Sequence, residues 1–136
     1  MFDKKVDYNA LNARQKEIYN FQKASAIFAE FGYTTVKLSD DWMGADFIAI
    51  SFDGSQYLRV QLKGRLTFDK KYQGKGIYIC FYDKKSECWY LYNHDEILKK
   101  VIKSIENSDT WNTNKPYHYK YLQSEHMEML SSCKIG

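Results

Sequence analysis

Three polar side chains in the stretch Met43–Arg65 have the chemistry to handle a divalent cation: Asp46, Gln61 and Lys63. Carboxylate and amide oxygens are ligands that Mg²⁺ accepts, and the ion usually keeps several waters besides one or two carboxylates. The backbone carbonyl of Leu62 is a possible third ligand. Lys63 cannot bind a metal while it is protonated, but beside a metal-activated water it could orient the nucleophile or hold a phosphate.

A β-hairpin would bring these side chains together. Asp53-Gly54 is the dipeptide expected of a two-residue hairpin loop. Such a loop pairs Ile48 with Arg59 and Asp46 with Gln61, and Gln61 and Lys63 then share one face of their strand. The opposite face carries Phe47, Ala49, Leu58, Val60 and Leu62, which are apolar and suited to packing against a helix. A three-residue loop would shift the register and scatter the cluster.

The pattern also fits a simpler structure, a surface salt bridge between Asp46 and Lys63 near a sheet edge. The segment that follows, Gly64–Gly76, carries Arg65, Lys70, Lys71 and Lys75. It is either a solvated flexible loop or a basic flap that contacts a phosphate backbone.

Hydrophobic periodicity predicts the elements that would position this hairpin. We expect a helix over Asn12–Phe31 with Asn12 as its N-cap and Gly32 after its end, a strand over Tyr33–Leu38 and a polar loop over Ser39–Ala45. After the hairpin we expect strands at Ile77–Tyr82 and Cys88–Tyr92, a helix Asp95–Ile105 capped by Asn93, a polar loop Glu106–Pro116, an exposed strand Tyr117–Leu122 and a short helix Ser124–Cys133 capped by Ser124. This order predicts an α/β fold, a mixed sheet covered by helices on its faces, in a single domain spanning residues 1–136.

Bulk composition sets wide limits on function. The chain has 136 residues and a formal net charge of +3, which permits nucleic-acid binding without requiring it. Its three cysteines, Cys80, Cys88 and Cys133, form no CxxC pair, and its histidines are not spaced as zinc ligands. With no signal-peptide pattern at the N-terminus and no 18-residue apolar run, we expect a cytoplasmic protein without a membrane partner.

The segments Gly44–Ala49 (GADFIA) and Arg59–Arg65 (RVQLKGR), preceded by a helix that ends at Gly32-Tyr33, resemble the PD-(D/E)XK nuclease superfamily. That superfamily is restriction-endonuclease-like and includes Holliday-junction resolvases and intron-encoded homing endonucleases. The resemblance covers about residues 22–92 and implies a central mixed β-sheet flanked by helices. It implies a DNA endonuclease that depends on Mg²⁺ or Mn²⁺ and hydrolyses phosphodiester bonds through a metal-activated water.

The same resemblance implies a role for each site residue. Asp46 and Gln61 would bind the metal together with the Leu62 carbonyl, Lys63 would be the catalytic lysine, and Gln22 stands where many members place a helix glutamate. Arg65, Lys70, Lys71 and Lys75 would contact the DNA, and two copies of the chain would act as a homodimer. Because Gln61 occupies the second acidic position, the motif is a QxK variant.

Two alternatives stay open. With Gln61 and Gln22 both neutral, the chain could be a catalytically inactive nuclease-fold module that binds DNA or a partner protein, unless Asp40 or Asp41 adds charge to the site. It could also be an interaction protein that uses a tyrosine-rich C-terminal surface.

Overall fold

The computed structural model describes residues 1–136, apart from the side chain of Trp42. Its helices are α1 (Ala13–Glu30), α2 (His94–Ile105), α3 (Asp109–Asn112) and α4 (Ser124–Met129), with 3₁₀ turns η1 (Tyr8–Ala10), η2 (Lys70–Tyr72) and η3 (Ser131–Cys133). Its strands are β1 (Tyr33–Trp42), β2 (Ala45–Ser51), β3 (Tyr57–Lys63), β4 (Thr67–Phe68), β5 (Ile77–Asp83), β6 (Cys88–Asn93) and β7 (Tyr117–His118).

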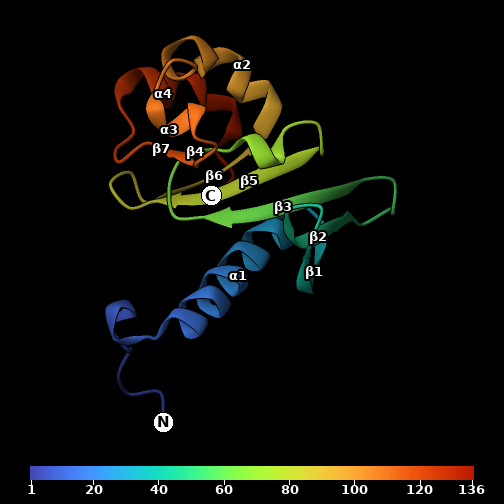
Figure 1. Cartoon of the computed structure of the whole chain (residues 1–136). Helices are drawn as coiled ribbons and strands as arrows, with labels where there is room; N and C mark the ends of the chain where they lie inside the picture. The colour runs from blue at the N-terminus through green and yellow to red at the C-terminus, as the bar shows by residue number, and fades with distance from the viewer.

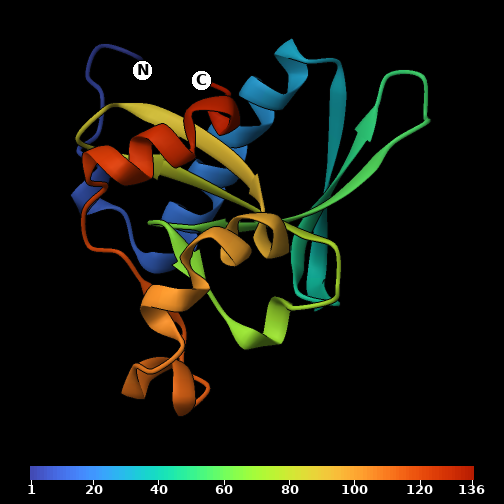
Figure 2. The same ribbon diagram turned by 90° about the horizontal axis from the view of Figure 1, so that it is seen from above.

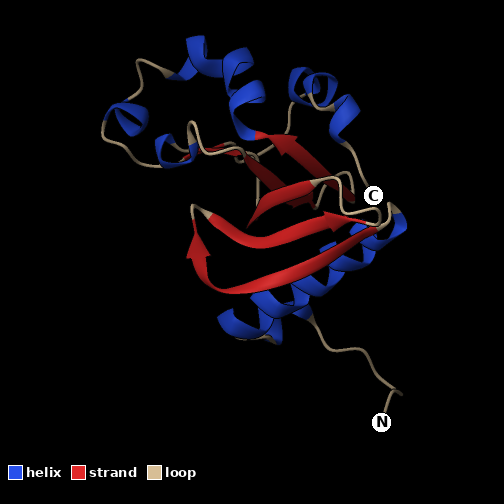
Figure 3. Ribbon diagram, turned by 90° about the vertical axis from the view of Figure 1, so that its right-hand side faces the viewer, coloured by secondary structure: helices blue, strands red, loops and turns tan.

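A five-stranded mixed sheet in the order β1-β2-β3-β5-β6 forms the centre of the fold. β1, β2 and β3 pair antiparallel, β3 and β5 pair parallel, and β5 and β6 pair antiparallel. Helices lie on both faces, with α1 on one side and the remaining helices on the other (Figures 1 and 3). The predicted α/β class, a mixed sheet flanked by helices, is confirmed.

The apolar face of the β2–β3 hairpin packs against α1, as its sequence pattern predicts. Phe47, Ala49 and Val60 are fully buried beneath Ala24 and Phe28 of the helix. The helix itself begins as expected, because Asn12 and Gln15 form a reciprocal capping box. Its buried stripe is narrower than expected, however, since Ile18 and Phe31 lie exposed.

The predicted register of the β2–β3 hairpin is confirmed, but the predicted loop is wrong. Ile48 pairs with Arg59 and Ile50 with Tyr57. The connection is a four-residue loop, closed by a bond from the Ser51 N–H to the Gln56 carbonyl, and it projects from the body of the molecule (Figure 2). Four residues, like two, keep paired positions in phase, so the side chains of Asp46 and Gln61 still belong to one face.

The tight two-residue turn lies instead between β1 and β2, in a segment expected to be a polar loop. β1 continues to Trp42, which pairs with Ala45, and only Met43 and Gly44 connect the two strands. Their φ angles are 52° and 88°, and a type I′ hairpin turn requires positive φ at both positions. The extended β1 carries Asp40 and Asp41 beside the start of β2.

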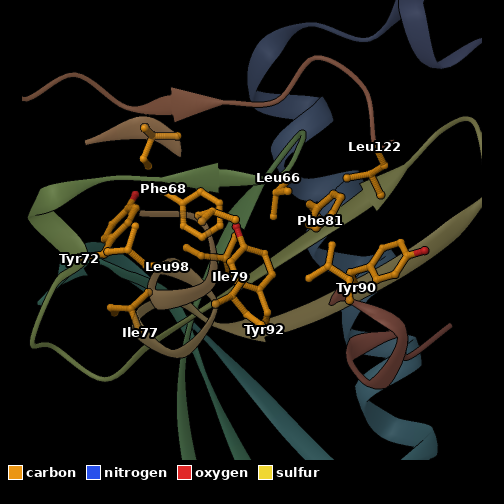
Figure 4. Packing of buried hydrophobic residues seen from close by; sticks show 14 of the residues in the cluster. Leu66, Phe68, Tyr72, Ile77, Ile79, Phe81, Tyr90, Tyr92, Leu98 and Leu122 are labelled. Atoms are coloured by element: carbon orange, nitrogen blue, oxygen red, sulfur yellow. The ribbon is translucent and has the colours of Figure 1, made fainter. Parts of the chain in front are cut away.

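The segment Gly64–Gly76 is not a solvated loop, because its middle forms part of the main core. Leu66, Phe68 and Tyr72 are buried against β5, β6 and α2 (Figure 4). Three apolar side chains within seven residues indicate burial, and the flanking lysines and glycines obscure that signal in the sequence. This crossover segment connects β3 to the parallel strand β5.

The C-terminal third also departs from expectation. The predicted polar loop 106–116 contains α3, whose Trp111 is buried, and the predicted exposed strand shortens to β7, which pairs with β4. The terminal helix α4 has Gln123 rather than Ser124 as its N-cap and ends at Met129. After η3 the chain returns to β6, where the Trp89 N–H donates to the Gly136 carbonyl.

We expect Gly44→Ala to destabilise the fold. A Cβ at Gly44 would lie 3.1 Å from the ring of buried Tyr72, and φ is +88°. Left-handed strain and overpacking together should lower the free energy of unfolding by about 2–4 kcal/mol in urea denaturation. Gly64→Ala is the control, because a Cβ there meets nothing within 4 Å. Equal losses in the two variants would contradict this packing.

Candidate functional site

Asp46 lies where the hydrogen-bond ladder between β2 and β3 stops. The last paired residues are Phe47 and Val60. Beyond them the Leu62 N–H, which a continued ladder would pair with a β2 carbonyl, donates instead to Oδ2 of Asp46 at 2.8 Å. The Asp46 side chain is therefore held against β3 by a backbone donor.

The electrostatics of Asp46 disfavour its charged form. Burial raises the pKa of its carboxyl, and the nearby carboxylate of Asp41 raises it further. The Leu62 N–H and the charge of Lys37 lower the pKa, but burial has the larger effect. A bound cation would reverse this balance, because it would compensate the two adjacent carboxylates.

Gln61 places a buried oxygen in the same region. The residue is only 8 % exposed, and within the described residues its Oε1 has no hydrogen-bond partner. Leaving a buried acceptor unpaired costs roughly 1–3 kcal/mol, so such an atom calls for an explanation. A divalent cation would give this oxygen a partner, because amide oxygens are among the ligands that such cations bind.

Lys63 lies half-buried beside these two residues, with its Nζ 5.6 Å from the centroid of the Tyr72 ring. Burial lowers the pKa of its ammonium, and the charge of Lys71 lowers it further, whereas Asp46, Asp69 and Asp41 act in the opposite direction. Asp46 and Lys63 are thus both shifted toward their neutral forms by a partly desolvated site.

A buried polar contact anchors the crossover segment beside Lys63. The Asp69 N–H donates to Nε2 of His94 at 3.0 Å, so the proton of this imidazole lies on Nδ1, which contacts Asp95 at 2.9 Å. Burial lowers the pKa of His94, against the opposing effects of Asp95 and Asp69. Tyr72 follows on η2 and packs edge-on against the His94 ring at 5.6 Å.

A cavity of about 960 Å³ opens over this site. Asp46, Gln61, Leu62 and Lys63 line one part of it. The rest is formed by η1, the first three turns of α1, Lys37 of β1 and the β5–β6 turn with the strand ends beside it. The sequence-predicted trio Asp46, Gln61 and Lys63 therefore opens into a single cavity.

Of the two other predicted metal ligands, the Leu62 carbonyl belongs to the site and Gln22 does not. The N–H and C=O of one strand residue point to the same side, so the Leu62 carbonyl faces the side on which its N–H meets Asp46. Gln22 is exposed and does not line the cavity, whereas Glu17 of the same helix does. Glu17 also lies 3.7 Å from Arg14 in an exposed ion pair.

The four basic residues predicted to contact DNA do not line the cavity. Lys71 and Arg65 lie on the crossover side, where their charges affect the pKa values of Lys63 and His118, respectively. Lys70 covers the ring of Trp111, and the Lys75 carbonyl accepts a bond from Arg59. The lysines of the cavity are Lys16, Lys23, Lys37, Lys63 and Lys84.

Several residues that contribute to the site carry no signal in the sequence. The crossover segment contributes Asp69 and Tyr72, and the start of α2 contributes His94. No spacing in the sequence relates these residues to Lys63. The sequence offers Asp40 and Asp41 as alternative sources of additional charge, and the structure places the carboxylate of Asp41 near Asp46. Tyr8, near the N-terminus, and Trp89, on β6, also line the cavity although they lie far apart in the sequence.

The oxygen atoms around Asp46 could supply a small number of ligands to one cation. Among the described side chains, no three of His, Cys, Asp and Glu are grouped to hold a metal. Asp46, the orphaned Oε1 of Gln61 and the Leu62 carbonyl form a hard-oxygen set, of the kind that Mg²⁺ and Mn²⁺ accept. The set suits an ion that keeps several waters, and it would bind that ion weakly.

Comparison with known proteins assigns no role to the site. No protein-family model matches the chain, and no curated protein or solved structure is significantly similar to it. In the part of the chain that the structure describes, no helix is both long and apolar enough to span a membrane.

Gln61→Met tests whether the buried oxygen serves a cation or the fold. In metal-free buffer we expect the free energy of unfolding to stay equal or rise by up to about 1 kcal/mol, because an unpaired buried acceptor is removed. Millimolar Mn²⁺ should raise the melting temperature of the wild type and not that of the variant. A large loss of stability without metal would instead indicate a structural role for the amide.

His94 should make the fold sensitive to acid. Its pKa lies below the unfolded value of 6.5, so the unfolded chain binds more protons below pH 6.5. Stability should therefore fall by as much as roughly 1.4 kcal/mol per pH unit below that value, measured by urea unfolding. His94→Gln should flatten this pH dependence. His118→Gln should flatten it less, although the pKa of His118 is also lowered. If the pH dependence of stability were unchanged in His94→Gln, His94 would not be the source of the acid sensitivity.

Proposed function

We propose that this protein is a divalent-metal-dependent nuclease that hydrolyses DNA phosphodiester bonds. The observation that carries the proposal is the buried Oε1 of Gln61, which lacks a hydrogen-bond partner within the described residues. It belongs to a residue that lines one cavity with Asp46 and Lys63. A carboxylate, an orphaned amide oxygen and a partly desolvated lysine form the set that metal-assisted phosphodiester hydrolysis uses. The resemblance of GADFIA and RVQLKGR to PD-(D/E)XK nucleases supports the same assignment.

Asp46, Gln61 and the Leu62 carbonyl would hold Mg²⁺ or Mn²⁺, and Asp41 would add negative charge beside them. The bound cation would supply Lewis acidity to the scissile phosphate and lower the pKa of a water. Asp46 is suited to its part because the Leu62 N–H fixes one of its oxygens at 2.8 Å and so orients the carboxylate.

Lys63 would hold a phosphate oxygen or orient the attacking water. Its half-buried ammonium is less screened than a surface charge, so its attraction to a phosphate is stronger. In the hydrolysis, a water oxygen bonds to phosphorus, one P–O ester bond breaks, the water releases a proton and the departing oxygen gains one. Arg65 and Lys71, on the crossover side, would bind the backbone that flanks the cleaved bond.

One observation favours a second candidate, the inactive nuclease-fold module. Gln61 is neutral, and the only other carboxylate that lines the cavity in the described chain, Glu17, is exposed and lies near Arg14. A site with so little negative charge could hold DNA or a partner protein without cutting. Cleavage assays separate the two candidates.

Asp46→Asn and Lys63→Ala should each reduce cleavage of supercoiled plasmid DNA in Mg²⁺ or Mn²⁺ by about 10²-fold or more, because each removes a group that acts on the reacting atoms. Asp41→Asn should cause a smaller loss, and Asp40→Asn, with the same change of charge on the neighbouring residue, should cause none. Equal cutting by all variants would indicate a contaminant and refute the enzyme. Metal-independent DNA binding without cleavage by the wild type would favour the module.

A further inference from the structure

Much of the cavity lies beyond the groups that the proposed chemistry uses. Its walls there are the 3₁₀ turn η1, the exposed side of α1 and the turn between β5 and β6. η1 and α1 are consecutive in the sequence, the β5–β6 turn lies far from both, and all three meet around one opening. What they present to it indicates what the cavity binds.

The charge of this region is strongly positive. Lys16, Lys23, Lys37 and Lys84 line it together with Lys63, and Glu17 and Asp46 are the only lining carboxylates among the described residues. A concave surface with this excess of cations attracts a polyanion and concentrates it near the site.

Aromatic rings lie among these lysines. Tyr8 and Tyr19 contact each other edge-on at 5.2 Å, and Tyr82 and Trp89 lie 5.3 Å apart across the cavity lining. Lys16 lies over the ring of Tyr8 at 5.3 Å and Lys23 over that of Tyr19 at 5.5 Å. A lysine side chain is long and flexible, so its ammonium can move to a phosphate and leave the ring face to a base.

The cavity is too small to enclose a double helix. A volume of 960 Å³ equals that of a cube about 10 Å on a side, whereas the major groove of B-DNA alone is roughly 12 Å wide. At roughly 3.4 Å per nucleotide, a length of about 10 Å accommodates about three nucleotides of one strand. Alternating cations and aromatic faces are the features by which proteins bind single strands.

We propose that this lysine- and tyrosine-lined part of the cavity binds a single-stranded DNA segment, such as an overhang or a locally unpaired stretch of a supercoiled duplex, and leads its backbone to Asp46 and Lys63. Lys16 and Lys23 contact phosphates, and Tyr19 stacks on a base. The inference rests on the proposed function, because it identifies the substrate of that same site as a single strand. DNA binding in the absence of metal tests it separately from cleavage.

The first test is fluorescence anisotropy in EDTA with a labelled 12-nucleotide single strand and the blunt duplex of the same sequence. We expect the wild type to bind the single strand at least tenfold more tightly. Lys16→Ala/Lys23→Ala should weaken that binding at least tenfold and reduce the slope of log K against log salt by roughly 1.4, or 0.7 per phosphate contact. The control, Lys99→Ala/Lys103→Ala, removes two exposed charges from α2 across the sheet and should change neither.

The second test separates stacking from charge. Tyr19→Ala should weaken single-strand binding by about fivefold or more without changing the salt slope, and Tyr19→Phe should bind as the wild type does. Tyr121→Ala is a matched control, because Lys120 lies over that exposed ring at the same 5.5 Å, outside the cavity.

The outcomes distinguish this inference from the nuclease proposal. Equal affinity for duplex and single strand, or equal losses in the cavity and control variants, would overturn the inference even if the wild type cleaves DNA. Selective single-strand binding that the cavity variants lose would uphold it even if no cleavage is seen with Mg²⁺ or Mn²⁺.

Discussion

The point at which the β2–β3 ladder ends is the constraint on which the site depends. Pairing stops at Phe47 and Val60, and the two strands then separate. The next donor, the Leu62 N–H, is satisfied by the Asp46 carboxylate at 2.8 Å. If the ladder continued by one more pair, that donor would meet a backbone carbonyl and Asp46 would lose the contact that orients it.

Burial then gives the separated strands their electrostatic character. The same partial desolvation raises the pKa of Asp46 and lowers that of Lys63, although the two groups attract each other. Neither shift is what a solvent-exposed salt bridge would produce, since each partner of such a pair favours the charged form of the other. An added charge would stabilise the ionised forms of these groups, either a cation bound at the carboxylates or a phosphate bound at the lysine.

The crossover segment is what makes the desolvation possible. Leu66, Phe68 and Tyr72 fix it to the core, and the bond from Asp69 to His94 satisfies a backbone donor that would otherwise be buried unpaired. Tyr72 in turn contacts both Lys63 and Lys71 through its ring. Tyr72 therefore couples the stability of the core to the geometry of the site.

Local signals in the sequence were sufficient for the elements and for the central hairpin. The capping pair of Asn12 and Gln15, the alternation of Phe47, Ala49, Leu58 and Val60, and the stripe of α2 predicted the α/β class, the register and the helix-facing side correctly. They did so because each depends on neighbours within a few residues or on the period of a strand. The turn at Met43-Gly44 was missed because one of its residues is a methionine, a poor signal for positive φ.

Only the tertiary structure decided which residues surround the hairpin. The burial of the crossover segment and the wall that Tyr8, Lys16 and Lys84 add to the cavity join residues far apart in the chain. Such contacts leave no period in the sequence, because they arise from how the sheet twists and how the helices pack on it. Asp46, Gln61 and Lys63 were determined by sequence, whereas their desolvation, and the cavity into which they open, were determined by the fold.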